Sequence, residues 1–156
     1  MKYIYRLNKD QLFNSCCLYD ENDQLVYTLK QKVLALGERY RYYDCNDNEV
    51  GLIKQSFFHG FEIYNYGVKV AELKRLVGFS FKKRFQLMDY GWIIESNFWG
   101  NKYFVRDSNN NLIMDVWVKF LALPDLIEVN VYDNENTFVC LLCAMALTFF
   151  KNSSND

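Results

Sequence analysis

The segment that decides the fold is residues 137–150, which read TFVCLLCAMALTFF and contain no charged side chain. Leucine, alanine and methionine favour a helix, and neither glycine nor proline interrupts the run. Apolar side chains would cover every side of this helix. A helix without a polar face is stable only when it is enclosed by protein or surrounded by lipid.

The length of the segment favours enclosure by protein. Its 14 residues make a helix about 21 Å long, whereas a bilayer core is about 30 Å thick and needs about 20 residues. Polar residues 134–136 precede the run, and Lys151 with the polar tail 152–156 follows it. We therefore predict a buried helix over residues 136–151. A membrane anchor that thins the bilayer is the alternative.

The remainder of the sequence predicts short β-strands separated by tight turns. Asp- and Asn-rich segments at 19–25, 43–50 and 106–112 resemble one another, and shorter ones occur at 65–67 and 89–91, as is typical of β-hairpins. We place the strands, about twelve in number, near residues 2–8, 12–19, 24–32, 38–44, 49–56, 60–65, 68–75, 80–88, 91–97, 102–107, 111–119 and 126–132.

Serial hairpins followed by one wholly apolar helix predict a mainly β fold. The sheet would form a closed antiparallel β-barrel around the buried C-terminal helix, since closure removes the exposed edges of a long meander. We expect residues 1–151 to form a single domain, with 152–156 as a polar tail.

Composition excludes several classes of protein. A hydrophobic content of 51% and an aromatic content of 18% argue against disorder. A net charge of −1 gives no general attraction to nucleic acid, so we expect no such partner. Residues 1–10 (MKYIYRLNKD) are not typical of a signal peptide. The five cysteines, an odd number, are better interpreted as reduced thiols of a cytoplasmic protein.

Two motifs with metal or redox spacing have simpler interpretations. The turns beginning at Asp44 and Asp107 match the first three ligand positions of a calcium-binding EF-hand loop, but lack its glycine and its final glutamate. Cys140 and Cys143 have redox spacing inside the apolar run, where burial would raise the pKa of a thiol. We expect hairpin turns and packing cysteines, and neither a metal nor a cofactor.

No catalytic signature appears in the sequence. His59 is the single histidine, and neither a nucleophile elbow nor a phosphate- or dinucleotide-binding glycine motif is present. We assign no catalytic residues and expect a non-enzymatic protein. The alternative is an enzyme or small-ligand carrier with a cavity at one barrel mouth, near His59, Tyr64 and Trp92.

Five basic residues form the candidate binding site. They are Lys74, Arg75, Lys82, Lys83 and Arg84, and we place them on strands 68–75 and 80–88, on either side of a turn at Val77-Gly78. Such a patch, with Phe79 as an apolar contact, can bind anionic head groups of phospholipid at a membrane surface. The alternative is a solvated face whose charges pair with acids such as Glu72 and Asp89.

The order of several segments resembles a known family. Residues 20–25 are followed by KQKVLALGE at 30–38, by Tyr43-Asp44 and Ile53-Lys54-Gln55, and by NVYD at 130–133 just before the apolar run. This pattern resembles the LURP-one-related, YxjI-like family of the Tubby C-terminal-like superfamily, which also includes phospholipid scramblases. The resemblance implies a twelve-stranded barrel wound around a hydrophobic C-terminal helix.

The resemblance implies less about function. Tubby proteins bind phosphoinositides through basic surface residues, but neither their site nor the scramblase calcium loop is matched here residue by residue. We therefore expect a binding or scaffold module, cytoplasmic and able to associate peripherally with a membrane. Its partner would be an anionic phospholipid, or a protein if the module is regulatory.

Overall fold

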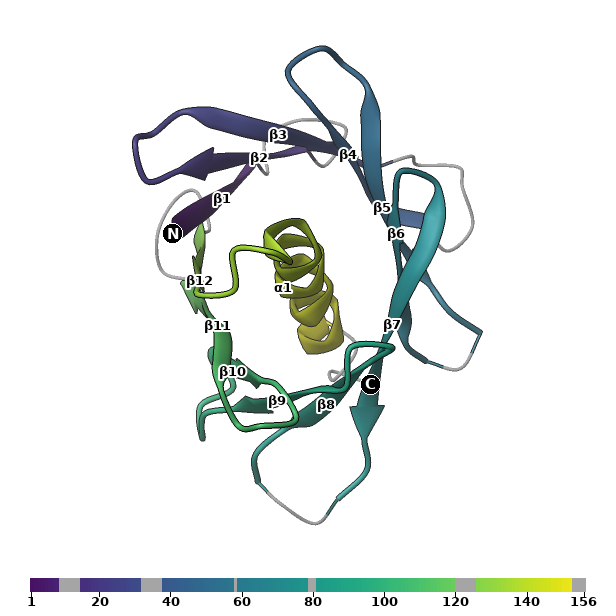
Figure 1. Ribbon diagram of the computed structural model, residues 1–156, viewed down its shortest axis with the longest axis vertical. Coiled ribbons are helices and arrows are strands. Elements are labelled where there is room, and N and C mark those ends of the chain that lie inside the picture. The colour runs from purple at the N-terminus through teal and green to yellow at the C-terminus, as the bar shows by residue number, and fades with distance from the viewer. Residues whose placement is uncertain (9–14, 32–37, 58, 79–80, 120–125, 153–156) are drawn as a thin grey trace.

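The chain forms a closed barrel of twelve antiparallel strands with one helix inside it (Figure 1). This computed structural model describes residues 1–8, 15–31, 38–57, 59–78, 81–119 and 126–152. Each strand pairs with its neighbours in sequence, and β1 pairs with β12 to close the barrel. The strands are β1 (Lys2–Asn8), β2 (Ser15–Asp20), β3 (Leu25–Lys30), β4 (Glu38–Tyr43), β5 (Glu49–Gln55), β6 (Phe61–Asn65), β7 (Val68–Leu76), β8 (Arg84–Met88), β9 (Trp92–Ser96), β10 (Lys102–Arg106), β11 (Leu112–Lys119) and β12 (Leu126–Val131).

The helix α1 (Thr137–Asn152) runs through the barrel and confirms the prediction of a core enclosed by protein (Figure 1). Every residue from Val139 to Leu147 is buried, so all sides of the helix are covered. The chain turns into the helix at Asp133, whose carboxylate accepts a hydrogen bond from the backbone N–H of Glu135 at 3.0 Å. Among the residues described, no helix combines the length and apolarity that a membrane crossing requires.

A polar contact inside the barrel fixes the helix against two strands. The hydroxyl of Tyr5 on β1 donates to the backbone carbonyl of Leu141 at 2.7 Å and lies 2.8 Å from the hydroxyl of Tyr42 on β4. All three groups are buried. Because a buried hydroxyl is costly unless it is hydrogen-bonded, this contact favours one rotation and depth of α1.

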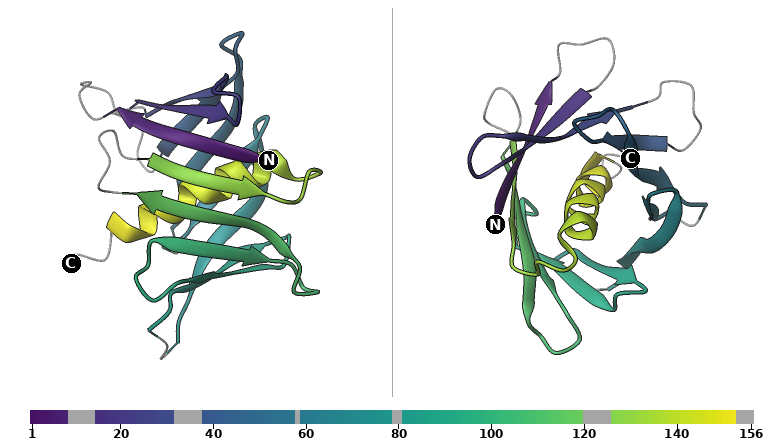
Figure 2. Two further views of the ribbon diagram at one scale, coloured as in Figure 1. Left: turned by 90° about the vertical axis from the view of Figure 1, so that its left-hand side faces the viewer. Right: turned by 45° about the horizontal axis from the view of Figure 1, so that its top comes forward.

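Alternating strand direction gives the barrel two different ends. We call the end at which α1 begins the proximal end; it also carries the turns that follow β2, β4, β6, β8 and β10. The distal end is where α1 finishes, and it carries the β5–β6, β7–β8 and β9–β10 connections. Figure 2 shows α1 ending at the opposite end of the barrel from the one at which it begins.

Three proximal turns share one geometry, as their repeated sequences predict. In each, the leading carboxylate (Asp20, Asp44 or Asp107) accepts hydrogen bonds of 2.9 Å from the backbone N–H groups two and four residues later. The fourth residue of each turn has a positive φ of 60–67°. These are hairpin turns, and their carboxylates accept hydrogen bonds from the backbone.

One predicted strand begins later than expected. Residues 80–88 were predicted as a strand, but β8 starts at Arg84, and residues 81–83 are described without strand pairing. Phe79 and residue 80 lie outside the described residues, as do 12–14 and 32 of two other predicted strands. Phe81, which the predicted strand included, is exposed because it precedes β8.

The contact between β5 and α1 predicts a sensitive glycine. A Cβ atom on Gly51 would lie 2.7 Å from Phe138 Cζ and 3.1 Å from Leu142 Cδ2. We expect Gly51→Ala to lower the free energy of unfolding by about 1–3 kcal/mol through overpacking, measured by urea denaturation. Gly78→Ala is the matched control, because no atom lies within 4 Å of its Cβ position. Equal stability of the two variants would contradict close seating of α1 on β5.

Buried tyrosine and thiol groups predict a loss of stability at alkaline pH. Burial raises the pKa of Tyr40 from 10.0 to about 12, and that of Cys140 from 9.0 to about 12. Above pH 9 the unfolded chain releases these protons first, so it is stabilised relative to the folded chain. We expect the free energy of unfolding to fall as the pH is raised from 9 to 12. The double variant Tyr40→Phe/Cys140→Ala should show a shallower fall; an unchanged slope would contradict this assignment.

Candidate anion-binding surface

Four of the five predicted basic residues line one hollow at the distal end. The hollow has a volume of about 410 Å³ and lies where β7 leaves the barrel and β8 returns to it. We call it the β7–β8 hollow; its lining includes Arg75, Lys82, Lys83 and Arg84, with Leu76, Val77, Gly78 and Phe81. The predicted cluster therefore exists, except for Lys74, which lies outside this lining.

The cations reach the hollow in a different way from that predicted. Lys82 and Lys83 lie in the connection between the strands rather than on β8, because that strand begins at Arg84. Phe79, the predicted apolar contact, lies outside the described residues. Val77 and Phe81 instead supply the exposed apolar side chains of the hollow.

Arg75 belongs to the inner face of the sheet, where a charge is unusual. It pairs in register with Phe85, and two residues before it in β7 is Leu73; both of these apolar side chains are buried. Arg75 is nevertheless exposed, because it is the second-last residue of β7 and lies at the distal rim of the barrel. Its charge also reaches the interior, where it opposes the rise that burial causes in the pKa of Tyr103.

Hydrogen bonds of its backbone groups to Ser96 fix the position of Lys83 in the hollow that Arg75 also lines. Its N–H donates to Ser96 Oγ at 2.9 Å, and its carbonyl accepts from the Ser96 N–H at 2.8 Å. Burial, and secondly the charge of Arg75, lower the pKa of Lys83 below its ordinary value of 10.5. Of the acids that the structure describes, none forms an ion pair with Arg75 or Lys83. Two adjacent cations thus share the hollow without a neutralising partner among the described residues.

Lys74 and Arg84, the other two cations on strands, form ion pairs. The alternative interpretation, a solvated face with paired charges, therefore holds for these two residues. Arg84 Nε lies 3.1 Å from Glu95 Oε1 on the neighbouring strand β9. Lys74 Nζ lies 3.8 Å from Glu72 Oε1. Asp89, the other predicted acid, lies in the β8–β9 turn at the proximal end and is far along the barrel from these cations.

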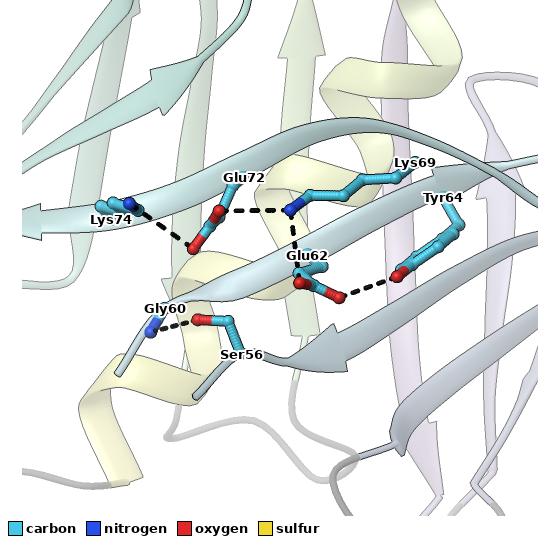
Figure 3. A network of polar contacts seen from close by, with 7 residues as sticks. All are labelled: Ser56, Gly60, Glu62, Tyr64, Lys69, Glu72 and Lys74. Carbon is cyan, nitrogen blue, oxygen red and sulfur yellow. Dashed lines mark hydrogen bonds and ion pairs between the residues drawn. The ribbon is translucent and has the colours of Figure 1, made fainter. Parts of the chain in front are cut away.

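Lys74 belongs to a separate polar network on the outer face of β6 and β7 (Figure 3). Lys69 Nζ lies 3.3 Å from both Glu62 and Glu72, and Tyr64 donates to Glu62 at 2.8 Å. The hydrogen bond from Tyr64 is the main reason that the pKa of Glu62 is lowered. Since Glu72 serves both Lys69 and Lys74, this network is close to neutral and is not part of the β7–β8 hollow.

A second hollow, which the sequence did not predict, adjoins the first on the outer face of β8, β9 and β10. Its volume is about 720 Å³, and its lining includes Ile93, Phe98, Phe104 and Arg106. Lys82 and Arg84 line both hollows and so connect them. The sequence contains one signal for this hollow. At outward positions of β9 and β10 it has apolar residues, whereas the alternation of a strand predicts polar ones.

The alternative site near His59 is not assembled as predicted. His59 is exposed in the β5–β6 connection at the distal end, with a φ of 60°. Tyr64 is engaged with Glu62 on β6, and Trp92 is buried on β9 against Tyr90. Two strands, β7 and β8, separate the strands that carry Tyr64 and Trp92.

The cysteines and acids have the structural roles expected of them. Cys140 and Cys143 are buried in the helix, and burial raises the pKa of both thiols. Within the described ranges, no group of three or more His, Cys, Asp or Glu side chains is arranged to hold a metal ion.

The proximity of Arg75 and Lys83 predicts a measurable change in titration. Removing the guanidinium by Arg75→Gln should raise the pKa of Lys83, because one of the two causes that lower it is removed. The pKa can be followed by NMR of the lysine side chain. Lys74→Gln is the matched control and should leave Lys83 unchanged. A Lys83 pKa that is insensitive to Arg75→Gln would show that the two charges do not meet.

Comparisons with known proteins address family and fold. The chain matches the family model described as LURP-one-related over residues 5–149. It is similar to the X-ray structure of a protein from Arabidopsis thaliana, with a TM-score of 0.61 and 11% sequence identity, covering 93% of this chain and 89% of that chain. At this identity the likeness shows the fold alone. A search of curated proteins finds no match.

Proposed function

We propose that the chain, which belongs to the LURP-one-related family, is a non-enzymatic binding module for anionic phospholipid head groups at a membrane surface. The β7–β8 hollow would receive the phosphate. Arg75 and Lys83 would act as its main charge partners, with Lys82 and Arg84 beside them, whereas Lys74 remains in its network with Glu72 on the outer face.

One observation carries the proposal: two cations lie together without an ion pair to any acid that the structure describes. Placing like charges side by side is unfavourable, and the charge of Arg75 is, after burial, the second cause that lowers the pKa of Lys83. A phosphate group between Arg75 and Lys83 would relieve this repulsion and accept charge-assisted hydrogen bonds. The guanidinium can bind two phosphate oxygens at once, whereas the ammonium acts as a point charge.

The side chains around the hollow favour a membrane surface, and not a soluble anion, as the ligand. Val77 and Phe81 line it together with the cations and are exposed. Exposed apolar side chains beside cations are typical of surfaces that bind anionic membranes, where each Lys or Arg contributes about 1 kcal/mol. The interior offers no competing site, because α1 fills the barrel.

The proposal is tested by co-sedimentation with vesicles of phosphatidylcholine, with and without phosphatidylserine. We expect binding only to the anionic vesicles, and a decrease in binding as salt is raised. Arg75→Gln/Lys83→Gln should weaken binding by about 2 kcal/mol, or roughly thirtyfold.

The matched control removes the same two kinds of charge from the opposite wall of the barrel. Lys2→Gln/Arg6→Gln changes β1, six strands away from β7 in either direction around the barrel. It breaks the ion pairs to Glu128 and Asp23 and the contact of Arg6 with the Tyr19 ring. Because Lys2 and Arg6 lie at the surface, we expect these losses to cost little stability. Equal loss in both double variants, or equal binding to neutral vesicles, would overturn the proposal.

A further inference from the structure

Among the residues that the structure describes, five highly exposed apolar side chains of the distal half lie on three neighbouring connections. Phe57 belongs to the β5–β6 connection, Val77 and Phe81 to β7–β8, and Phe98 and Trp99 to β9–β10. Their exposed fractions are 101%, 103%, 90%, 66% and 79%, respectively. Values near 100% mean that the side chain projects from its loop and contacts almost nothing else. Large apolar groups in this state usually mark an interaction surface.

The three connections form one continuous sector of the distal rim. Lys83 and Ser96 are joined by two hydrogen bonds, which tie β7–β8 to the start of β9–β10. Lys82 lines hollows that include Phe81 on one side and Phe98 on the other. At the other border Gly60 packs so tightly that a Cβ would lie 2.6 Å from the Leu73 carbonyl oxygen of β7.

The charge of the barrel is divided between its ends. The three distal connections, residues 56–60, 77–83 and 97–101, contain no acidic residue, whereas Lys82 and Lys83 lie within them. The proximal turns and the start of α1 carry the acids instead: Asp20, Glu21, Asp23, Asp44, Asp47, Asp89, Asp107, Asp133 and Glu135. An anionic surface would therefore attract these three distal connections and repel the acidic proximal turns.

We infer that the protein docks with its distal end against an anionic bilayer, inserting Phe57, Val77, Phe81, Phe98 and Trp99 among the lipids. The inference rests on the proposed function and adds its orientation and its apolar contribution. The barrel axis would stand steeply on the membrane, with the acidic turns farthest from it (Figure 2).

A bilayer fits this surface better than the groove of a protein does. The five side chains come from three separate connections, and only Phe98 and Trp99 contact each other as rings, so a protein partner would need several pockets at matching positions. A lipid interface needs no complementary shape, since it closes around each side chain. Tryptophan and phenylalanine are favoured at that depth, and cations beside them reach the head groups.

Trp99 supplies a probe of insertion. In a Trp117→Phe background the remaining tryptophans are Trp99 and the buried Trp92. We expect vesicles with phosphatidylserine and brominated acyl chains to quench the fluorescence of this variant and shift it to the blue. The matched control Trp99→Phe/Trp117→Phe retains an apolar tip but leaves only Trp92, and should show neither change.

Polar substitution of the tips tests their contribution to affinity. Phe57→Ser and Trp99→Ser should each reduce binding to anionic vesicles about tenfold. Tyr66→Ser changes an exposed aromatic residue in the proximal β6–β7 turn and should leave binding unchanged.

The outcomes separate this inference from the proposed function. Binding to anionic vesicles without quenching of Trp99 would leave the proposed function standing and overturn insertion. Absence of binding to any vesicle would overturn both. Self-association without lipid that Phe57→Ser or Trp99→Ser abolishes in sedimentation-velocity runs would assign the tips to a second copy of the chain, and would overturn the inference.

Discussion

A helix with no polar side has to be enclosed on every side, and this constraint organises the whole molecule. With its side chains an α-helix is about 10–12 Å wide. A barrel of about eight strands has an interior that its own side chains fill, so a helix requires a wider one. Twelve strands supply that width, and small or slender residues supply the closest approaches, as Gly51 does beneath Phe138. The large number of strands thus follows from the need to enclose the apolar helix.

Filling the barrel in this way determines where binding can occur. The interior that a barrel of this size would otherwise offer to a ligand is occupied by residues 139–147, and its buried hydroxyls on Tyr5 and Tyr42 are used to fix the helix. Cys140 and Cys143 become packing groups for the same reason. Chemistry is therefore left to the rims and the outer face, which are built from connections and alternate strand positions. The β7–β8 hollow lies at such a rim, where an inner-face position of β7 reaches solvent as Arg75.

The main elements could be predicted because each follows from local physics. The apolar run predicts α1, the repeated Asp and Asn residues predict the hairpin turns, and the family resemblance, now confirmed by the match over residues 5–149, implies the barrel. The site was predicted less well. Alternation suggested that Phe81 continues β8, yet the strand starts at Arg84, so Lys82 and Lys83 belong to a connection. Whether Arg84 binds a ligand or Glu95 depends on the register between β8 and β9, which no local pattern specifies.

The difference between the two barrel ends follows from connectivity more than from any motif. In a closed meander with an even number of strands, alternate connections fall on opposite ends, and a helix that follows the last strand must begin at one end and finish at the other. Acidic hairpin turns follow β2, β4, β8 and β10 and are therefore gathered at one end, whatever the overall charge. A net charge of −1 conceals this separation, since it averages an acidic proximal end with a distal sector that has cations and no acids in its three connections. Strand parity thus decides which connections share an end, and the apolar helix, by requiring a closed antiparallel barrel, requires an even number of strands.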